Sequence, residues 1–426
     1  MNNLVKFKST FTPPIFYGWW LVVATLFLNS ATGTPAFGAV GLWVDSLERE
    51  FHWSRTQLSW AFSLGQLEGS IAGPIIGILV AKYGARNVVL IGISTCGLGF
   101  ALLSQTQSLV IFYVSYAILM IGAGAGGWLP MMTVINDWFD KKRGIAMGLG
   151  GMGFSIGGFF LIPFLAFLML HPNIGWRITA LGLSVFYIII MYPLFRIIRN
   201  TPEEYDEIPD GIRNLNFRQS DQNIPSTVDE PESIDLSVYQ IVKIPVFWII
   251  SISHAASTML IGTMTVHLIL SLIDQGMSTQ VASTIWGTTL LVSGAGQILG
   301  GYMSDKVTIK YALCIFGCMQ AVGVVIATFV TSVYSAPLFV IVFGLSFGAR
   351  VPLGTAIRSQ YFGRKSFGKV LGISMMPMSI LMMVGPLVAG RMYDSLGDYK
   401  LAFYLIAAVS VLGSLGFLFA KKPTLN

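Results

Sequence analysis

The chain has 426 residues, of which 54% are hydrophobic and only 11% are charged, and its formal net charge is +6. A soluble domain carries about 25% charged residues, so this composition excludes a soluble globular protein. The apolar residues suffice for about a dozen spans of about 20 residues each. Helices satisfy their own backbone in hydrocarbon and the runs are too long for barrel strands, so we expect an all-α membrane protein.

Twelve apolar runs follow one another along the chain, and the stretch 199–243 divides them six and six. The runs are 17–41, 57–80, 87–105, 108–134, 144–170, 177–196, 244–271, 281–303, 311–333, 336–360, 370–390 and 401–420. The dividing stretch is rich in Asp, Glu, Pro, Asn and Ser, which is typical of a solvated loop. We therefore predict an N-terminal six-helix half at 1–198, a cytoplasmic central linker at 199–243 and a C-terminal six-helix half at 244–426.

Lys and Arg gather on one set of connections, which includes both termini and the linker, for example at 141–143 and 364–369. Cytoplasmic loops carry this excess, so both termini are predicted to be cytoplasmic. The same bias accounts for the basic net charge without any nucleic-acid partner. We expect a multi-pass protein of the inner or plasma membrane.

The two halves share an internal repeat. Gly77 to Lys82 matches Gly301 to Lys306 at an offset of 224 residues, and Trp138-Phe139 matches Tyr361-Phe362 at 223. Each half has six predicted spans, an even number, so both copies of the repeat begin on the same side of the membrane, as in a parallel duplication. The substrate is then expected near the midplane, between the halves.

These motifs together resemble the major facilitator superfamily and, within it, the monocarboxylate transporters and their microbial relatives, including oxalate/formate exchangers. The resemblance rests on Tyr17-Gly-Trp-Trp20, Gly77 to Arg86, Trp138 to Gly144, Gly175-Trp-Arg177, Thr201-Pro-Glu203, Pro209-Asp-Gly211, Tyr361 to Lys365, and Gly385 to Gly390 with Tyr393-Asp394. It implies a secondary transporter that moves a small organic anion by alternating access and works as a monomer. Proton symport and proton-independent anion exchange of the oxalate/formate type are the two modes that it implies.

The chain also departs from that branch. The helix 1 lysine of the animal transporters aligns near Ala36, and the stretch from Ser293 to Gln297 in the eighth run carries no charge. The intramembrane cation is in the tenth run instead, so lactate or pyruvate is a class-level expectation only.

Ionisable residues inside the spans are functional candidates, because a charge at the bilayer centre is costly. They are Glu68, His254, His267, Arg350 and Arg358. At about 1.5 Å per residue, Glu68, His254 and Arg350 lie roughly 16, 14 and 21 Å deep. Arg358 and His267 are expected close enough to an interface to snorkel.

Arg350 is the predicted substrate-binding cation, because its guanidinium stays charged and its planar fork matches a carboxylate. The alternatives are a permanent ion pair with Glu68 and a cap on carbonyl groups freed by a kink at Pro352. Glu68 is the predicted proton-coupling site; a buried, hydrogen-bonded glutamate is the alternative. His254 is expected to bind substrate or carry a proton, unless it only packs.

Two further polar residues, Asn29 and Gln297, lie at a similar depth and are predicted to line the substrate site; as an alternative, they bridge helices. A gating role is predicted for Lys82, Arg86, Asp305 and Lys306, which lie at the cytoplasmic ends of the repeat. Ala81 occupies the position at which the first copy usually has an acid.

We expect no metal and no cofactor. The three cysteines, Cys96, Cys314 and Cys318, lie in apolar runs without a neighbouring His or acid. An enzyme needs a nucleophile, a metal cluster or paired acids at one depth, and a sensor needs a substantial soluble domain. The sequence favours neither, and we expect a small organic anion, protons and the bilayer as partners.

Overall fold

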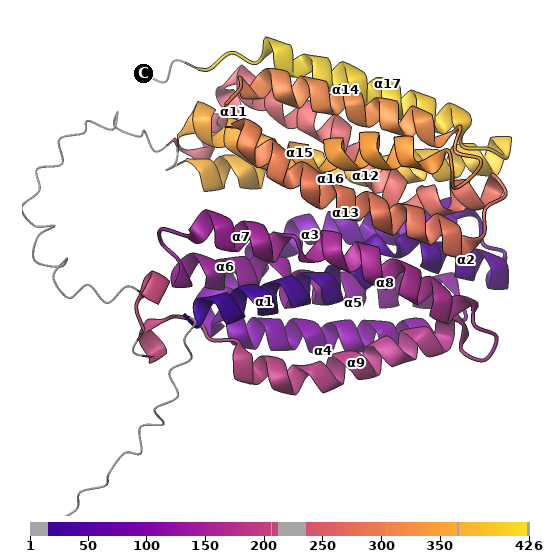
Figure 1. The fold of residues 1–426 in the computed structure, drawn as a ribbon, viewed down its shortest axis with the longest axis horizontal. Coiled ribbons are helices and arrows are strands. Elements are labelled where there is room, and N and C mark those ends of the chain that lie inside the picture. Colours follow the sequence, from indigo (N-terminus) through magenta and orange to yellow (C-terminus); the bar gives the residue numbers. More distant parts are fainter. Residues whose placement is uncertain (1–15, 206, 212–235, 305, 364–365, 424–426) are drawn as a thin grey trace, which may run out of the picture.

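The computed structural model describes residues 16–205, 207–211, 236–304, 306–363 and 366–423, except for the side chains of residues 67–70 and 211. The regular elements in these residues are helices, packed as one bundle of nearly parallel rods (Figure 1). Eleven helical segments of this described part of the chain are long and apolar enough to cross a bilayer. The predicted eighth span is α13 (Thr279–Ser304), 26 residues whose many Thr, Ser and Gly lower its hydropathy. The predicted all-α membrane fold is confirmed.

The N-terminal set of helices makes six crossings, of which three are interrupted. Its elements are α1 (Gly18–Leu28), the π-helix η1 (Asn29–Gly38), α2 (Val40–Phe51), α3 (Arg55–Tyr83), α4 (Ala85–Ser104), α5 (Leu109–Gly126), α6 (Trp128–Trp138), α7 (Arg143–Gly151), α8 (Gly153–Leu170) and α9 (Gly175–Ile197). Two short 3-10 turns, η2 (Glu203–Tyr205) and η3 (Pro209–Gly211), follow α9.

The C-terminal set begins with the short helix α11. Its elements are α11 (Val238–Lys243), α12 (Pro245–Asp274), α13, α14 (Ile309–Ala327), α15 (Ala336–Phe362), α16 (Phe367–Leu396), α17 (Lys400–Gly416) and η4 (Phe417–Phe419). In Figure 1 this set is the orange and yellow layer above the indigo and magenta N-terminal set.

The first crossing differs from the sequence prediction in two ways. The predicted run ends at residue 41, but helix continues as α2 to Phe51, because its charged residues lie at the end of the bundle while its apolar residues stay buried. The middle of the crossing is a π-helix of ten residues that contains Pro35. Proline has no N–H to donate, and π-helical turns occur where the regular ladder is broken.

The bundle has two distinct ends. The linker end, at the left of Figure 1, carries the turns after α3, α6, α9, α13 and α15 and both ends of the linker segment. The far end, at the right, carries the turns after α2, α4, α8, α12, α14 and α16.

The two sets share a hydrophobic core at the far end only. One cluster contains buried residues of both sets, among them Trp43 and Phe62 from the N-terminal set and Leu268 and Trp286 from the C-terminal set. Trp286 Nε1 donates to the Gly38 carbonyl oxygen across the boundary at 2.9 Å. Toward the linker end the buried residues form two separate clusters, one in each set. The buried core is therefore continuous across the two sets at the far end and divided between them at the linker end.

Candidate functional site

A buried polar cluster lies inside the C-terminal set, centred on Arg350 of α15. Arg350 is 2% exposed, and its Nη1 donates to Gln320 Oε1 of α14 at 2.7 Å. Its Nε and Nη2, and Gln320 Nε2, have no hydrogen-bond partner among the described residues. Gln320 thus holds one end of the guanidinium and leaves the other edge without an acceptor.

That free edge is the one that binds a carboxylate side-on, because the Nε–H and Nη2–H bonds point the same way. Arg177 uses the same edge elsewhere in this protein. Its Nε and Nη2 lie 3.2 and 2.8 Å from Glu50 Oε1. The unfilled edge of Arg350 has the donor geometry for a carboxylate ligand.

The local sequence explains why Arg350 points into the C-terminal set. On the opposite side of α15 a Cβ on Gly348 would lie 1.8 Å from the Ser293 carbonyl oxygen of α13, so only glycine permits this approach. Arg350 lies about 160° around the helix from Gly348, at 100° per residue. It therefore faces α14 rather than α13.

Arg358, two turns along α15, is also buried and is fully engaged. Its Nη1 donates to the Gly354 carbonyl oxygen at 2.6 Å, and its Nε donates to Ser374 Oγ of α16 at 3.1 Å. Nη1 also lies 3.3 Å from His254 Nδ1 of α12. A guanidinium only donates, so His254 accepts through Nδ1 and is neutral, with its proton on Nε2.

No carboxylate contacts either buried guanidinium in the part of the chain that the structure describes. The five ion pairs there involve Arg49, Arg55, Arg143 and Arg177 instead. Two positive charges are buried in one half of the molecule without a protein counter-ion among these residues. Buried charges are normally paired, so this arrangement calls for an anion from elsewhere.

The other two predicted substrate residues do not join Arg350. Asn29 begins η1, and its Nδ2 donates to the Gly150 carbonyl oxygen of α7, inside the N-terminal set. Gln297 of α13 reaches Ser155 Oγ of α8, on the other set, at 3.5 Å. Both bridge helices, which is the alternative that the sequence left open. His254 contacts Arg358, the other buried arginine of α15, rather than Arg350 itself.

The predicted proton and gate residues fall partly outside the described residues. Glu68 is in α3, but its side chain is not described, and Asp305 is not described. The Arg86 guanidinium stacks on Phe195 at 3.7 Å, and the Lys82 ammonium lies 5.1 Å from the Tyr83 ring, both within the N-terminal set. Lys306 is exposed in the turn after α13. The described members of this group make no hydrogen bond, ion pair or ring contact with the other set.

The expectation that Arg358 and His267 snorkel is wrong. They are 1% and 0% exposed, respectively. Neighbouring carbonyl and hydroxyl groups satisfy both side chains inside the protein, so neither needs to reach an interface.

A second polar cluster at the far end was missed from the sequence. Arg55, the first residue of α3, is 5% exposed and binds Glu48 of α2 through Nε at 2.9 Å. Across the boundary its Nη2 binds Asp274 Oδ1 of α12 at 3.0 Å, and its Nη1 donates to the Tyr399 hydroxyl at 2.9 Å. From α16, Asp394 accepts the backbone N–H of Arg55 at 3.1 Å. We call these five residues the Arg55 lock.

The sequence contained only a weak indication of this lock. Charged residues at helix ends indicate the orientation of the spans, but nothing in their spacing shows which helices meet across the boundary. A lone basic residue directly after a Ser N-cap, with acids at the ends of other spans, is the only local hint.

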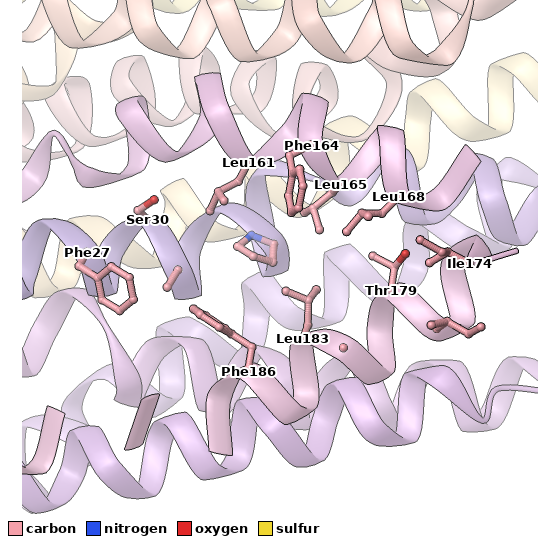
Figure 2. A pocket seen from close by; sticks show the side chains of 14 residues that line it. Phe27, Ser30, Leu161, Phe164, Leu165, Leu168, Ile174, Thr179, Leu183 and Phe186 are labelled. Atoms are coloured by element: carbon pink, nitrogen blue, oxygen red, sulfur yellow. The ribbon is translucent and has the colours of Figure 1, made fainter. Parts of the chain in front are cut away.

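A large pocket lies apart from both polar clusters. It has a volume of about 460 Å³ and is formed by α1, η1, α8 and α9, with Phe27, Leu161, Phe164, Leu183 and Phe186 among its lining (Figure 2). No charged side chain of the described residues lines it. It therefore offers no group that would hold an organic anion.

Comparisons with known proteins agree with this architecture. Residues 19–349 and 247–426 match the Major Facilitator Superfamily. The chain is 24% identical to mouse Monocarboxylate transporter 11 over 95% of this chain and 88% of that protein. It is 23% identical to human Monocarboxylate transporter 2 over 95% and 86%, and 23% identical to the MFS transporter asaE of Aspergillus flavus over 95% and 86%.

Solved structures share the fold at low identity. A bacterial homologue of the human lysosomal transporter Spinster, in an inward-facing and unoccupied conformation, superposes with a TM-score of 0.73 at 14% identity, covering 96% of this chain and 99% of that chain. A D-xylose-proton symporter superposes with a TM-score of 0.73 at 16% identity, covering 96% and 100%. The protein is a multi-pass membrane transporter rather than an enzyme, and it belongs to the Major Facilitator Superfamily.

Proposed function

We propose that the protein is a secondary active transporter that moves a small organic anion of the monocarboxylate class by alternating access, with protons as the coupling ion. The observation that carries this proposal is the free Nε–Nη2 edge of Arg350. It is a buried, oriented donor pair with no acceptor among the described residues. A carboxylate supplies two acceptor atoms and one negative charge, which are the groups that this edge lacks.

The electrostatics of the C-terminal set support an anion rather than a sugar or a cation. Arg350 and Arg358 together place two positive charges in a region where no described acid contacts them. Bringing in a neutral ligand would leave both charges uncompensated. Relatives named monocarboxylate transporters lend further support, at 22 to 24% identity.

The packing of α13 against α8 supports a rocking motion between the sets. Gly287, Gly294 and Gly301 recur every seven residues on one face of α13. A Cβ on Gly287 would lie 2.7 Å from the Gly158 carbonyl oxygen, whereas one on Gly301 would meet nothing within 4 Å. The face that is in contact near the far end is therefore open near the linker end.

The partner helix shows the same change. On α8 a Cβ on Gly158 would lie 2.4 Å from Leu290 of α13, whereas Gly148, nearer the linker end on α7, has open space. In the second copy of the repeat, Gly372 of α16 also has open space. We infer that these open glycines come into close contact when the linker ends approach. The linker end is predicted to be cytoplasmic, so we assign the present state as inward-facing.

Uptake into proteoliposomes tests the proposal. Labelled monocarboxylates should enter wild-type vesicles faster with an inward proton gradient than without one. Arg350→Lys keeps the charge but removes the fork, and we expect it to lose most uptake. Arg391→Lys, at an exposed arginine of α16, is the matched control and should transport normally. Wild-type uptake by the Arg350→Lys protein would contradict the assigned role.

The same vesicles separate symport from exchange. If Glu68 carries the proton, Glu68→Gln should lose the response to the proton gradient but keep counterflow of labelled against unlabelled anion. Exchange of the oxalate/formate type instead predicts counterflow without any proton response in the wild-type protein.

A further inference from the structure

His267 of α12 connects the interior to the Arg55 lock. It is fully buried in the C-terminal set. Its Nδ1 lies 2.9 Å from the Tyr399 hydroxyl, and its Nε2 lies 2.9 Å from the Pro386 carbonyl oxygen of α16. Ser59 Oγ of α3, from the other set, lies 3.2 Å from the same Nε2. The imidazole therefore contacts α3, α16 and the turn between α16 and α17, and with them both sets of the bundle.

The partners of His267 fix its tautomer. A carbonyl oxygen only accepts, so Nε2 carries the proton and donates to Pro386. Nδ1 is then the acceptor of a hydrogen bond that the Tyr399 hydroxyl donates. Burial raises the pKa of the Tyr399 phenol well above its ordinary value, so this hydroxyl keeps its proton. The hydrogen bonds are therefore all donated in one direction, from Arg55 to Tyr399, from Tyr399 to His267 and from His267 to Pro386.

A second proton on His267 is incompatible with this chain of hydrogen bonds. Protonated Nδ1 is a donor, so it would face the donating Tyr399 hydroxyl. That hydroxyl would have to turn away and accept from both Arg55 and His267. The new positive charge would also lie one hydroxyl away from the Arg55 guanidinium. The closed lock therefore admits only neutral His267.

We propose that His267 is a proton-binding site in the gate at the far end, and that proton binding from that side opens the Arg55 lock. This deepens the proton coupling of the proposed function and rests on it. Because the far end is predicted to be extracellular, external acid should favour the outward-open state. The lock re-forms only after His267 has released the proton.

Several charged and titratable groups surround the imidazole. They are Arg55 and Glu48 from the N-terminal set, Asp274 on the same helix, and Tyr393, Asp394 and Tyr399 from α16 and the turn that follows it. The carboxylates are engaged by Arg55 or by N–H groups at the start of α3, and none of them is a hydrogen-bond partner of the ring. Protonation of the ring therefore acts first on Tyr399, and through Tyr399 on Arg55.

The opening can be measured without any substrate. Gln107 and Tyr334 are exposed in turns of the two different sets at the far end. Spin labels on cysteines at these positions, in a background with the three native cysteines replaced by alanine, report the distance between the sets. An imidazole in water has a pKa of about 6.5, so below that value we expect the open-to-closed ratio to rise about ten-fold per pH unit.

Three variants test the assignment of the proton to His267. His267→Gln should abolish the pH response, and Tyr399→Phe should weaken it by removing the link to Arg55. Arg55→Ala should give the long distance at every pH. His171→Gln alters another far-end histidine and should respond as the wild type does. A full pH response in His267→Gln, or none in the wild-type protein, would overturn the proposal.

The distance measurement also separates this proposal from the transport proposal. If monocarboxylate uptake fails while the labelled protein still opens in acid through His267, the substrate assignment is wrong and the gate assignment stands. If uptake succeeds while the distance between the spin labels does not change with pH, the proton acts elsewhere and the gate assignment is wrong.

Discussion

Arg350→Met should stabilise the protein while abolishing anion transport. Methionine fills a similar elongated volume without any polar atom. The change removes two buried donors that have no acceptor, Nε and Nη2, each of which costs about 1–3 kcal/mol. It also removes the bond to Gln320 and leaves Gln320 Oε1 unpaired, which costs about 1–3 kcal/mol. The net expectation is a gain of about 1–3 kcal/mol in unfolding free energy.

Arg358→Met is the matched comparison on the same helix. Arg358 is equally buried, but its donors are used by the Gly354 carbonyl oxygen, Ser374 Oγ and His254. Replacing it leaves His254 Nδ1 without a donor and removes two further hydrogen bonds, and no unsatisfied donor is removed in exchange, so we expect destabilisation of about 1–3 kcal/mol.

Thermal unfolding of the purified protein in detergent, followed by tryptophan fluorescence, measures both effects. The Tm should rise for Arg350→Met and fall for Arg358→Met, while uptake is lost in Arg350→Met. A saturating carboxylate substrate should raise the wild-type Tm and leave that of Arg350→Met unchanged, because only a bound ligand adds stability. An equal fall in Tm for both variants would show that the Arg350 edge is satisfied and would refute the reasoning.

Three other changes test the packing described above. Gly148→Leu should fold normally but transport at least ten-fold more slowly, because the leucine side chain blocks closure of the linker end. Gly182→Leu is the control, at a glycine of α9 with equally open space, and it should transport normally. Gly287→Ala should lower the Tm, since its Cβ would lie 2.7 Å from a backbone oxygen and overpacking costs about 1–3 kcal/mol; an unchanged Tm would contradict the close contact. Asp210→Ala removes the acceptor of two backbone N–H groups in the α6–α7 turn, at 3.2 and 2.6 Å, so amide exchange there should accelerate while exchange in α12 stays the same.

Most of the fold follows from the sequence because hydropathy reports directly on burial in lipid. The spans agree with the helices to within a few residues at most boundaries. Hydropathy does not detect helix that continues outside the apolar run, so it does not predict α2. Periodicity does not distinguish the π-helix η1 from an α-helix. The repeat of Gly77 and Gly301 was visible, but only coordinates show that both glycines face open space.

The candidate site was predictable only in part. The depth of Arg350 and its need for an acceptor follow from residue type and position in the run. The rotation of α15 does not, because it depends on the close approach of Gly348 to α13. Nor does the position of Gln320, 30 residues earlier on another helix. Asn29 and Gln297 have the depth of a substrate site but face other partners, so depth alone was insufficient.

Among the described residues, no acid contacts Arg350 or Arg358, and this has an electrical consequence. Moving one elementary charge through the whole membrane potential is worth about 2.3 kcal/mol per 100 mV. Any reorientation that shifts these two guanidiniums within the field is therefore voltage-dependent while they are unaccompanied. An inside-negative potential pulls them toward the cytoplasm and so favours the state in which they lie nearest to it. A bound monoanion cancels part of this mobile charge, so voltage should act more strongly on the return of the empty carrier than on the loaded step.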